Sequence, residues 1–144
     1  MRISDVLTSK PSHDVVTISP DATVRELLAT LAEHNVGALV VSGDGTSVAG
    51  IVSERDVVRG LNDDPEVLAA PVQSIMTAEV HTCDTGADID DLMRLMTERR
   101  IRHVPVVSGD ALHGIVSIGD IVKTRIAELE FDREQLSNYI ASSG

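Results

Sequence analysis

Aromatic and cysteine residues are nearly absent from this chain of 144 residues. It has no Trp, and its only aromatic residues are Phe131 and Tyr139, both near the C-terminus. The core must therefore be built from aliphatic side chains and methionine. A flat base would be held between aliphatic walls rather than stacked on a ring. The single cysteine, Cys83, excludes a disulfide framework and a cysteine-rich zinc or iron–sulfur site.

Long hydrophobic runs and a surplus of positive charge are missing as well. Stretches such as residues 39–41 fall far short of the roughly 20 apolar residues that a membrane helix needs, and no signal-peptide pattern opens the chain. The formal net charge is −11, whereas phosphate backbones are bound by basic surfaces. We therefore expect a cytoplasmic protein that binds neither membranes nor nucleic acid.

An internal repeat dominates the sequence. Residues 17–41 align with residues 82–106, and apolar positions match apolar positions, as in Leu27 with Leu92. Further on, residues 50–56 and 114–120 both read Gly-Ile-Val-Ser-x-x-Asp. Each copy is too short to bury a sufficient core alone, so we expect the two copies to pack on each other.

Each copy predicts the element order β-α-β-β-α. Extended segments at residues 15–18 and 80–83 precede helices with apolar spacings of three and four, for which Asp21 or Thr23 and Asp88 are N-cap candidates. Strands are expected at residues 38–41, 48–52, 104–107 and 112–116. A second helix begins at Ser53 or Ser117 and, in the second copy, continues to residue 140. That tail either packs on its own module, crosses a dimer interface or covers a cleft.

Tandem units of this length that each end in Gly-Ile-Val-Ser-x-x-Asp resemble the CBS domain family, in which two copies form a Bateman module. The resemblance covers the chain up to about residue 128. It implies an α+β fold with two repeats packed around a pseudo-twofold axis. We expect repeat 1 at residues 1–64, a linker at 65–71, repeat 2 at 72–128 and a C-terminal helical extension at 129–144.

The resemblance also implies clefts between the copies that bind adenine nucleotides. Ser53 and Asp56 would contact a ribose in one cleft, and Ser117 and Asp120 in the other. Arg55, inside the first motif, is a further candidate. The family's adenine and phosphate contacts would fall on Thr17, Gly37, Ala38, Thr82, Arg102, His103, Val104 and Pro105.

The Ser-x-x-Asp pattern suits a ribose on chemical grounds. A carboxylate can accept two hydrogen bonds from vicinal hydroxyls, and the N–H groups at a helix start attract anions. Arg59 and Lys123 follow the two aspartates by three residues, so each cation shares a helix face with its motif. The same pattern is nearly a capping box, which stabilises helices without any ligand. Either role, or both, fits the sequence.

The densest basic run, residues 99–103, has two interpretations. Its cations would stabilise a helix end, or Arg102 and His103 would reach a ligand phosphate. Cys83 is expected in a buried strand as a small hydrophobe. No P-loop, nucleophile elbow or metal motif occurs, so we predict neither catalytic nor metal-binding residues.

These observations predict a non-enzymatic regulatory sensor, and an energy sensor in particular, that binds AMP, ADP, ATP or NAD(H). S-adenosylmethionine is the alternative ligand, but the cations Arg59, Arg102 and Lys123 favour a phosphate. The competing hypothesis is a dimerising interaction subunit with vestigial ligand sites, which would regulate a partner enzyme or transporter. A homodimer is expected in either case.

Overall fold

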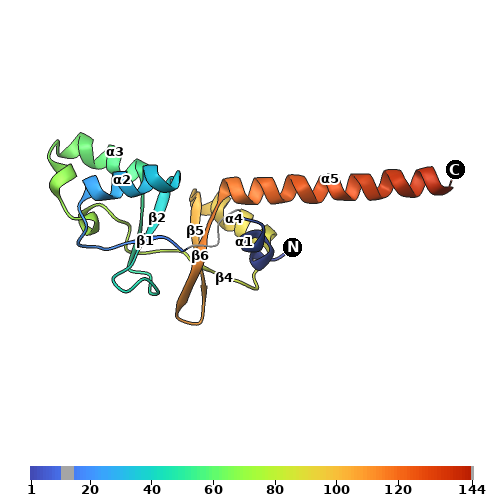
Figure 1. Cartoon of the computed structure of the whole chain (residues 1–144), viewed down its shortest axis with the longest axis horizontal. Coiled ribbons are helices and arrows are strands. Elements are labelled where there is room, and N and C mark those ends of the chain that lie inside the picture. The colour runs from blue at the N-terminus through green and yellow to red at the C-terminus, as the bar shows by residue number, and fades with distance from the viewer. Residues whose placement is uncertain (11–14, 144) are drawn as a thin grey trace.

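Two three-stranded sheets lie side by side in the computed structural model, which describes residues 1–10 and 15–143 (Figure 1). In each sheet the first strand pairs in parallel with the second, and the second pairs antiparallel with the third. The predicted β-α-β-β-α order and the α+β class are confirmed. The strands are β1 (Thr17–Ile18), β2 (Ala38–Val41) and β3 (Gly50–Ser53), then β4 (Cys83–Asp84), β5 (His103–Ser108) and β6 (Ala111–Ser117).

The helices begin where the sequence predicts. Thr23, rather than Asp21, caps the first of them: its hydroxyl accepts a hydrogen bond from the Glu26 N–H, and the Glu26 carboxylate accepts one from Thr23. Asp88 caps the matching helix, as predicted. The four helices that the sequence predicts are α2 (Val24–His34), α3 (Glu54–Asp63), α4 (Ile89–Arg99) and α5 (Ile118–Ser143).

Three short helical segments were not predicted, and they cross between the repeats. Ile3 and Val6 of α1 (Ile3–Ser9), at the start of the chain, are buried in the core of the second repeat. Val67 and Val72 are buried in the core of the first; they come from the 3₁₀ turns η1 (Val67–Ala69) and η2 (Val72–Ser74), which join the repeats. Each core therefore depends on a segment from outside its own run of strands, which ties the repeats together.

Matching contacts relate the two repeats. The Glu54 N–H donates to the Gly37 carbonyl at 3.0 Å, and in the second repeat the Ile118 N–H donates to the Arg102 carbonyl at 2.8 Å. The register places Ala38 beside Ser53 and His103 beside Ser117. His103 therefore occupies the position that Ala38 has in the first repeat.

The C-terminal helix departs from this symmetry. Ile121 is fully buried, but every residue from 129 to 142 is exposed, and the distal part of α5 points away from both sheets (Figure 1). The interpretations in which residues 129–142 pack on their own module or cover a cleft are therefore wrong. Within the described residues, no helix combines the length and apolarity needed to cross a membrane.

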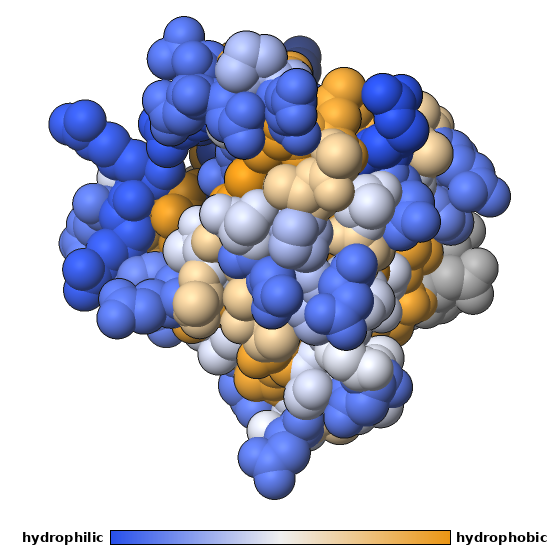
Figure 2. All heavy atoms as spheres, turned by 90° about the vertical axis from the view of Figure 1, so that its left-hand side faces the viewer, coloured by the Kyte–Doolittle hydropathy of each residue, from blue (hydrophilic) through white to orange (hydrophobic). Residues whose placement is uncertain are grey.

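The outer end of the first repeat is largely hydrophilic, with small hydrophobic patches between the polar side chains (Figure 2). Val58 and Leu61 of α3 and Leu28 of α2 are its exposed large apolar side chains. The apolar side chains gathered in the core are therefore mostly shielded at this end.

Candidate functional site

Two clefts lie between the repeats, and we name them cleft A and cleft B. Cleft A has a volume of about 390 Å³ and includes the first Ser-x-x-Asp motif. Cleft B has a volume of about 460 Å³ and lies between α1, β2 and β6. Cleft A is lined by Gly37, Ala38, Ile51, Ser53, Glu54, Arg55, Asp56, Thr77, Glu79, Val80, His81 and residues 100–103.

The motif in cleft A caps α3 and still leaves an acceptor available. The N–H of Ser53 donates to Oδ2 of Asp56 at 2.8 Å, and the N–H of Asp56 donates to Oγ of Ser53 at 3.4 Å. The capping interpretation is therefore confirmed. Among the described residues, no hydrogen bond engages Oδ1 of Asp56. The half-buried carboxylate thus retains an oxygen that can accept a hydrogen bond from a ligand.

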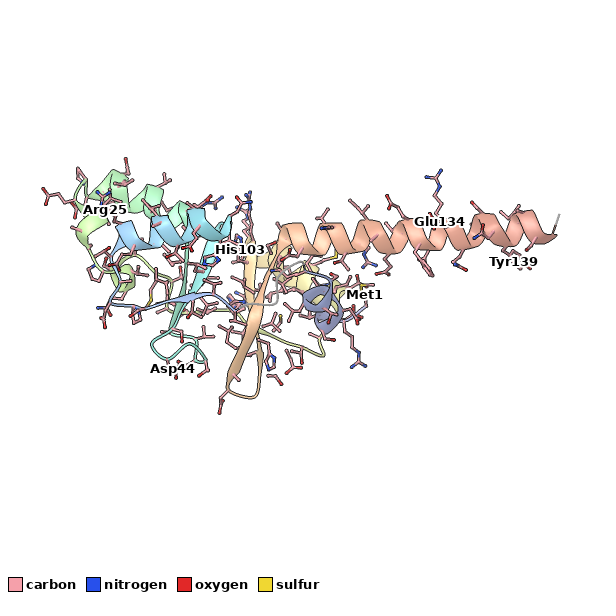
Figure 3. The ribbon with its side chains drawn as sticks, in the orientation of Figure 1. Met1, Arg25, Asp44, His103, Glu134 and Tyr139 are labelled. Atoms are coloured by element: carbon pink, nitrogen blue, oxygen red, sulfur yellow. The ribbon has the colours of Figure 1, made fainter. Side chains whose placement is uncertain are left out.

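His103 lies at the centre of the molecule, between the repeats (Figure 3). A Cβ atom added to Gly37 would be 3.7 Å from Nε2 of His103, so the imidazole packs directly against the first repeat. Burial lowers the pKa of His103 below 6.5, and the nearby Asp120 carboxylate offsets this only in part. The ring is therefore neutral at pH 7 and offers cleft A a hydrogen-bonding group without charge.

The second motif differs from the first because Lys10, which lines cleft B, binds Asp120. Its Nζ lies 3.1 Å from Oδ2 of Asp120 and donates to the carbonyl of Ile115 at 2.9 Å. The N–H of Ser117 also donates to Oδ2, at 2.9 Å. Burial raises the pKa of Asp120, but the Ser117 N–H and the Lys10 ammonium outweigh it, so the pKa lies below 3.8. Among the described residues, no hydrogen bond engages Oδ1 of Asp120 either, so the two carboxylates differ in the Lys10 ammonium bound to Asp120 and not in the number of free oxygens.

The two clefts also differ in charge at matching positions. The alignment of residues 4–8 with residues 73–77 carries Lys10 onto Glu79. Lys10 lines cleft B, and Glu79 lines cleft A. Arg55, Arg100 and Arg102 also line cleft A. Cleft A therefore contains both cations and carboxylates. At the position that matches Lys10, it has the carboxylate of Glu79 instead of an ammonium group.

The structure brings seven of the predicted site residues together in cleft A, and one of these, Ala38, also lines cleft B. They are Gly37, Ala38, Ser53, Arg55, Asp56, Arg102 and His103. Eight others line neither cleft: Thr17, Arg59, Thr82, Val104, Pro105, Ser117, Asp120 and Lys123.

Five of these eight residues have a clear place elsewhere in the fold. Val104 and Pro105 are buried within β5, and Thr17 is paired with Val40. Arg59 and Lys123 are exposed on their helices. Roles for these residues stay predictions.

Sequence reasoning missed Lys10, Glu79 and Arg100. The first two carry a signal in the sequence, because they occupy matching positions near the openings of the two repeats.

Cys83 is the first residue of β4 and is partly buried rather than enclosed. Burial, together with the adjacent Asp84, raises its pKa to about 11. The thiol is therefore protonated at neutral pH and is a poor nucleophile.

Comparisons with known proteins identify the family. The model of the CBS domain matches residues 3–63 and 72–126. The chain therefore belongs to the CBS domain family and carries a pair of these domains. Such pairs are generally regulatory.

Individual relatives agree with this assignment. The CBS domain-containing protein CBSX3, mitochondrial, of Arabidopsis thaliana is 36% identical over 146 residues, which span 96% of this chain and 71% of that protein. The crystal structure of ATU1752 from Agrobacterium tumefaciens superposes with a TM-score of 0.82 at 40% identity, covering 87% of this chain and 99% of that one. The CBS domain pair of MJ0100, in complex with 5′-methylthioadenosine and S-adenosyl-L-methionine, shares the fold at a TM-score of 0.77 but is only 24% identical, over 86% of this chain and 98% of that chain.

Proposed function

We propose that this protein is a regulatory module that binds an adenosine-containing nucleotide in cleft A and thereby senses its concentration. The observation that carries the proposal is the meeting of Ser53 and Asp56, from one repeat, with Arg102 and His103, from the other. A ligand held there touches both repeats. It therefore favours whichever arrangement of the repeats it binds more tightly.

The chemistry of cleft A supports a ribose and an adenine. Oδ1 of Asp56 accepts a ribose hydroxyl while Oδ2 continues to cap α3. Ala38, Ile51 and Ile101 line the same cleft and provide aliphatic walls for the base. This arrangement suits a chain that has no aromatic residue near the clefts.

The cations of cleft A support a phosphate-bearing ligand. Arg55, Arg100 and Arg102 line it, and guanidinium groups bind phosphate through paired hydrogen bonds. AMP, ADP, ATP and NAD(H) fit this requirement, whereas the sulfonium of S-adenosylmethionine adds a positive charge. An energy-sensing role follows if the ligand is AMP, ADP or ATP.

A second candidate, an interaction subunit with vestigial ligand sites, is favoured by the second motif. Its Asp120 lines neither cleft and forms an ion pair with Lys10. Under both candidates we propose a homodimer that acts in the cytoplasm on a protein partner and catalyses no reaction.

Calorimetric titration of the full chain with AMP, ATP, NADH and S-adenosylmethionine tests the proposal. We expect at least one phosphate-bearing nucleotide to bind. Asp56→Asn should weaken that binding about tenfold to a hundredfold, because the amide nitrogen cannot accept a ribose hydroxyl while the amide oxygen still caps the helix. The matched control is Asp110→Asn, in the turn between β5 and β6, which should leave affinity unchanged. No binding by any of the four ligands would refute the proposal.

A further inference from the structure

One side of α5, from Val122 to Leu136, carries a regular and mostly apolar seam. Val122, Ile126, Leu129 and Leu136 are 49%, 51%, 59% and 61% exposed, and Arg133 completes the spacing between the last two. Their separations alternate between four and three residues, which is the spacing of a coiled-coil helix. We call these five residues the α5 seam. Most of it lies beyond residue 126, where the match to the CBS domain ends.

The α5 seam is not the face by which α5 attaches to its own repeat. That attachment uses Ile121, which is fully buried, and Arg125, which forms ion pairs with Asp90 and Glu128. Because successive residues of an α-helix are rotated by about 100° around its axis, the seam lies to one side of this face. A helix segment this short is only marginally stable alone in water. An exposed apolar stripe on it therefore needs a partner helix.

Charge along α5 indicates what the partner is. Near the body the seam is flanked by Lys123, and farther out it is flanked by Glu130. A second α5 that runs in the opposite direction brings Lys123 of each copy beside Glu130 of the other. Ile126 then lies opposite Leu129, and Arg133 lies opposite Val122 rather than opposite another Arg133. Every contact occurs twice, as a twofold interface requires.

We propose that the α5 seam binds the α5 seam of a second copy of this chain as an antiparallel helix pair. The aliphatic stem of Arg133 covers Val122 of the other copy, and its guanidinium reaches water. The pair joins two modules through a segment that the CBS domain match does not include. Because the interface does not involve cleft A, it holds whether or not a nucleotide binds there.

Analytical ultracentrifugation of the full chain tests the interface. We expect a dimer that Leu129→Lys weakens roughly a hundredfold or more, because it places a charge in the central layer of both copies. Phe131→Lys is the matched control: Phe131 is equally exposed at 59% but lies off the seam. A wild-type monomer, or equal effects of the two substitutions, would overturn the proposal. Circular dichroism confirms that both variants are folded.

A charge exchange tests the direction of the pair. Lys123→Glu should weaken the dimer several-fold, because it faces Glu130 of the second copy with a like charge. The double variant Lys123→Glu with Glu130→Lys should restore it. A parallel pair does not bring these two positions together, so failure of the double variant to recover would contradict the antiparallel arrangement.

Discussion

Asp56 and Asp120 show how the same sequence motif can have different contacts in the two repeats. Both cap a helix through Oδ2 and a preceding serine, so the local sequence makes them equivalent. The difference is Lys10, which comes from the end of α1 and binds Asp120. A single residue distant in sequence therefore gives one of the two carboxylates a cationic partner.

Lys10→Met should lower the free energy of unfolding at pH 7 by about 1 kcal/mol or less, as expected for a partly buried ion pair. The folded-state pKa of Asp120 is depressed, so its contribution is complete above 3.8 and is lost as pH falls through the folded pKa. Urea unfolding of both proteins across a pH series measures the difference. The difference should become smaller in acid, where only the hydrogen bond from Lys10 to the Ile115 carbonyl remains, and Arg25→Met, at an exposed position on α2, serves as the control.

A difference in unfolding free energy between the variant and the wild type that is as large at the lowest pH as at pH 7 would contradict a role for the Lys10–Asp120 pair.

At the scale of elements, β3 packs closely against the segment that joins the repeats. The N–H of Ile51 donates to the Thr77 carbonyl at 3.0 Å, and the Thr77 N–H returns a bond to the Ile51 carbonyl at 2.9 Å. A Cβ atom on Gly50 would lie 2.8 Å from the Thr77 oxygen and 2.7 Å from Sδ of Met76. Glycine is therefore required here by the approach of the two backbones.

Gly50→Ala should lower the free energy of unfolding by about 1–3 kcal/mol, because the backbone oxygen cannot move without breaking this pairing. Gly43→Ala is the control, since no atom lies within 4 Å of its added Cβ; it should change stability by less than about 0.5 kcal/mol. Thermal and urea unfolding measure both. Equal stabilities of the two variants would show that β3 and residue 77 are not in close contact.

The local sequence pattern predicted most of the helices and strands. It did not predict that a segment at the start of the chain packs in the core of the second repeat. The apolar spacing of residues 24–31 and the β-branched run at 38–41 each carry the information for one helix and one strand. Ile3 and Val6 are the two buried residues of the short helix α1. Two such positions in the local sequence do not indicate that this helix completes the core of the second repeat. Such packing depends on contacts between distant segments, which periodicity does not encode.

At the scale of the whole molecule, the pairing of the repeats creates the clefts. The resemblance to the CBS domain family implied clefts between the copies, and the structure brings Asp56 together with Arg102 and His103 in one of them. The similarity of the two copies did not predict that the clefts would differ, although Lys10 and Glu79 carry opposite charges at matching positions. The chain is a pair of similar domains in which one of the two motif aspartates, Asp120, is ion-paired with Lys10.

The most direct test of the central claim is a crystal structure of the full chain grown with the nucleotide that calorimetry selects. The account predicts density for the ribose at Oδ1 of Asp56, with the base between Ala38 and Ile101 and the phosphates toward the arginines of cleft A. A nucleotide bound only at Asp120, or bound outside both clefts, would contradict it.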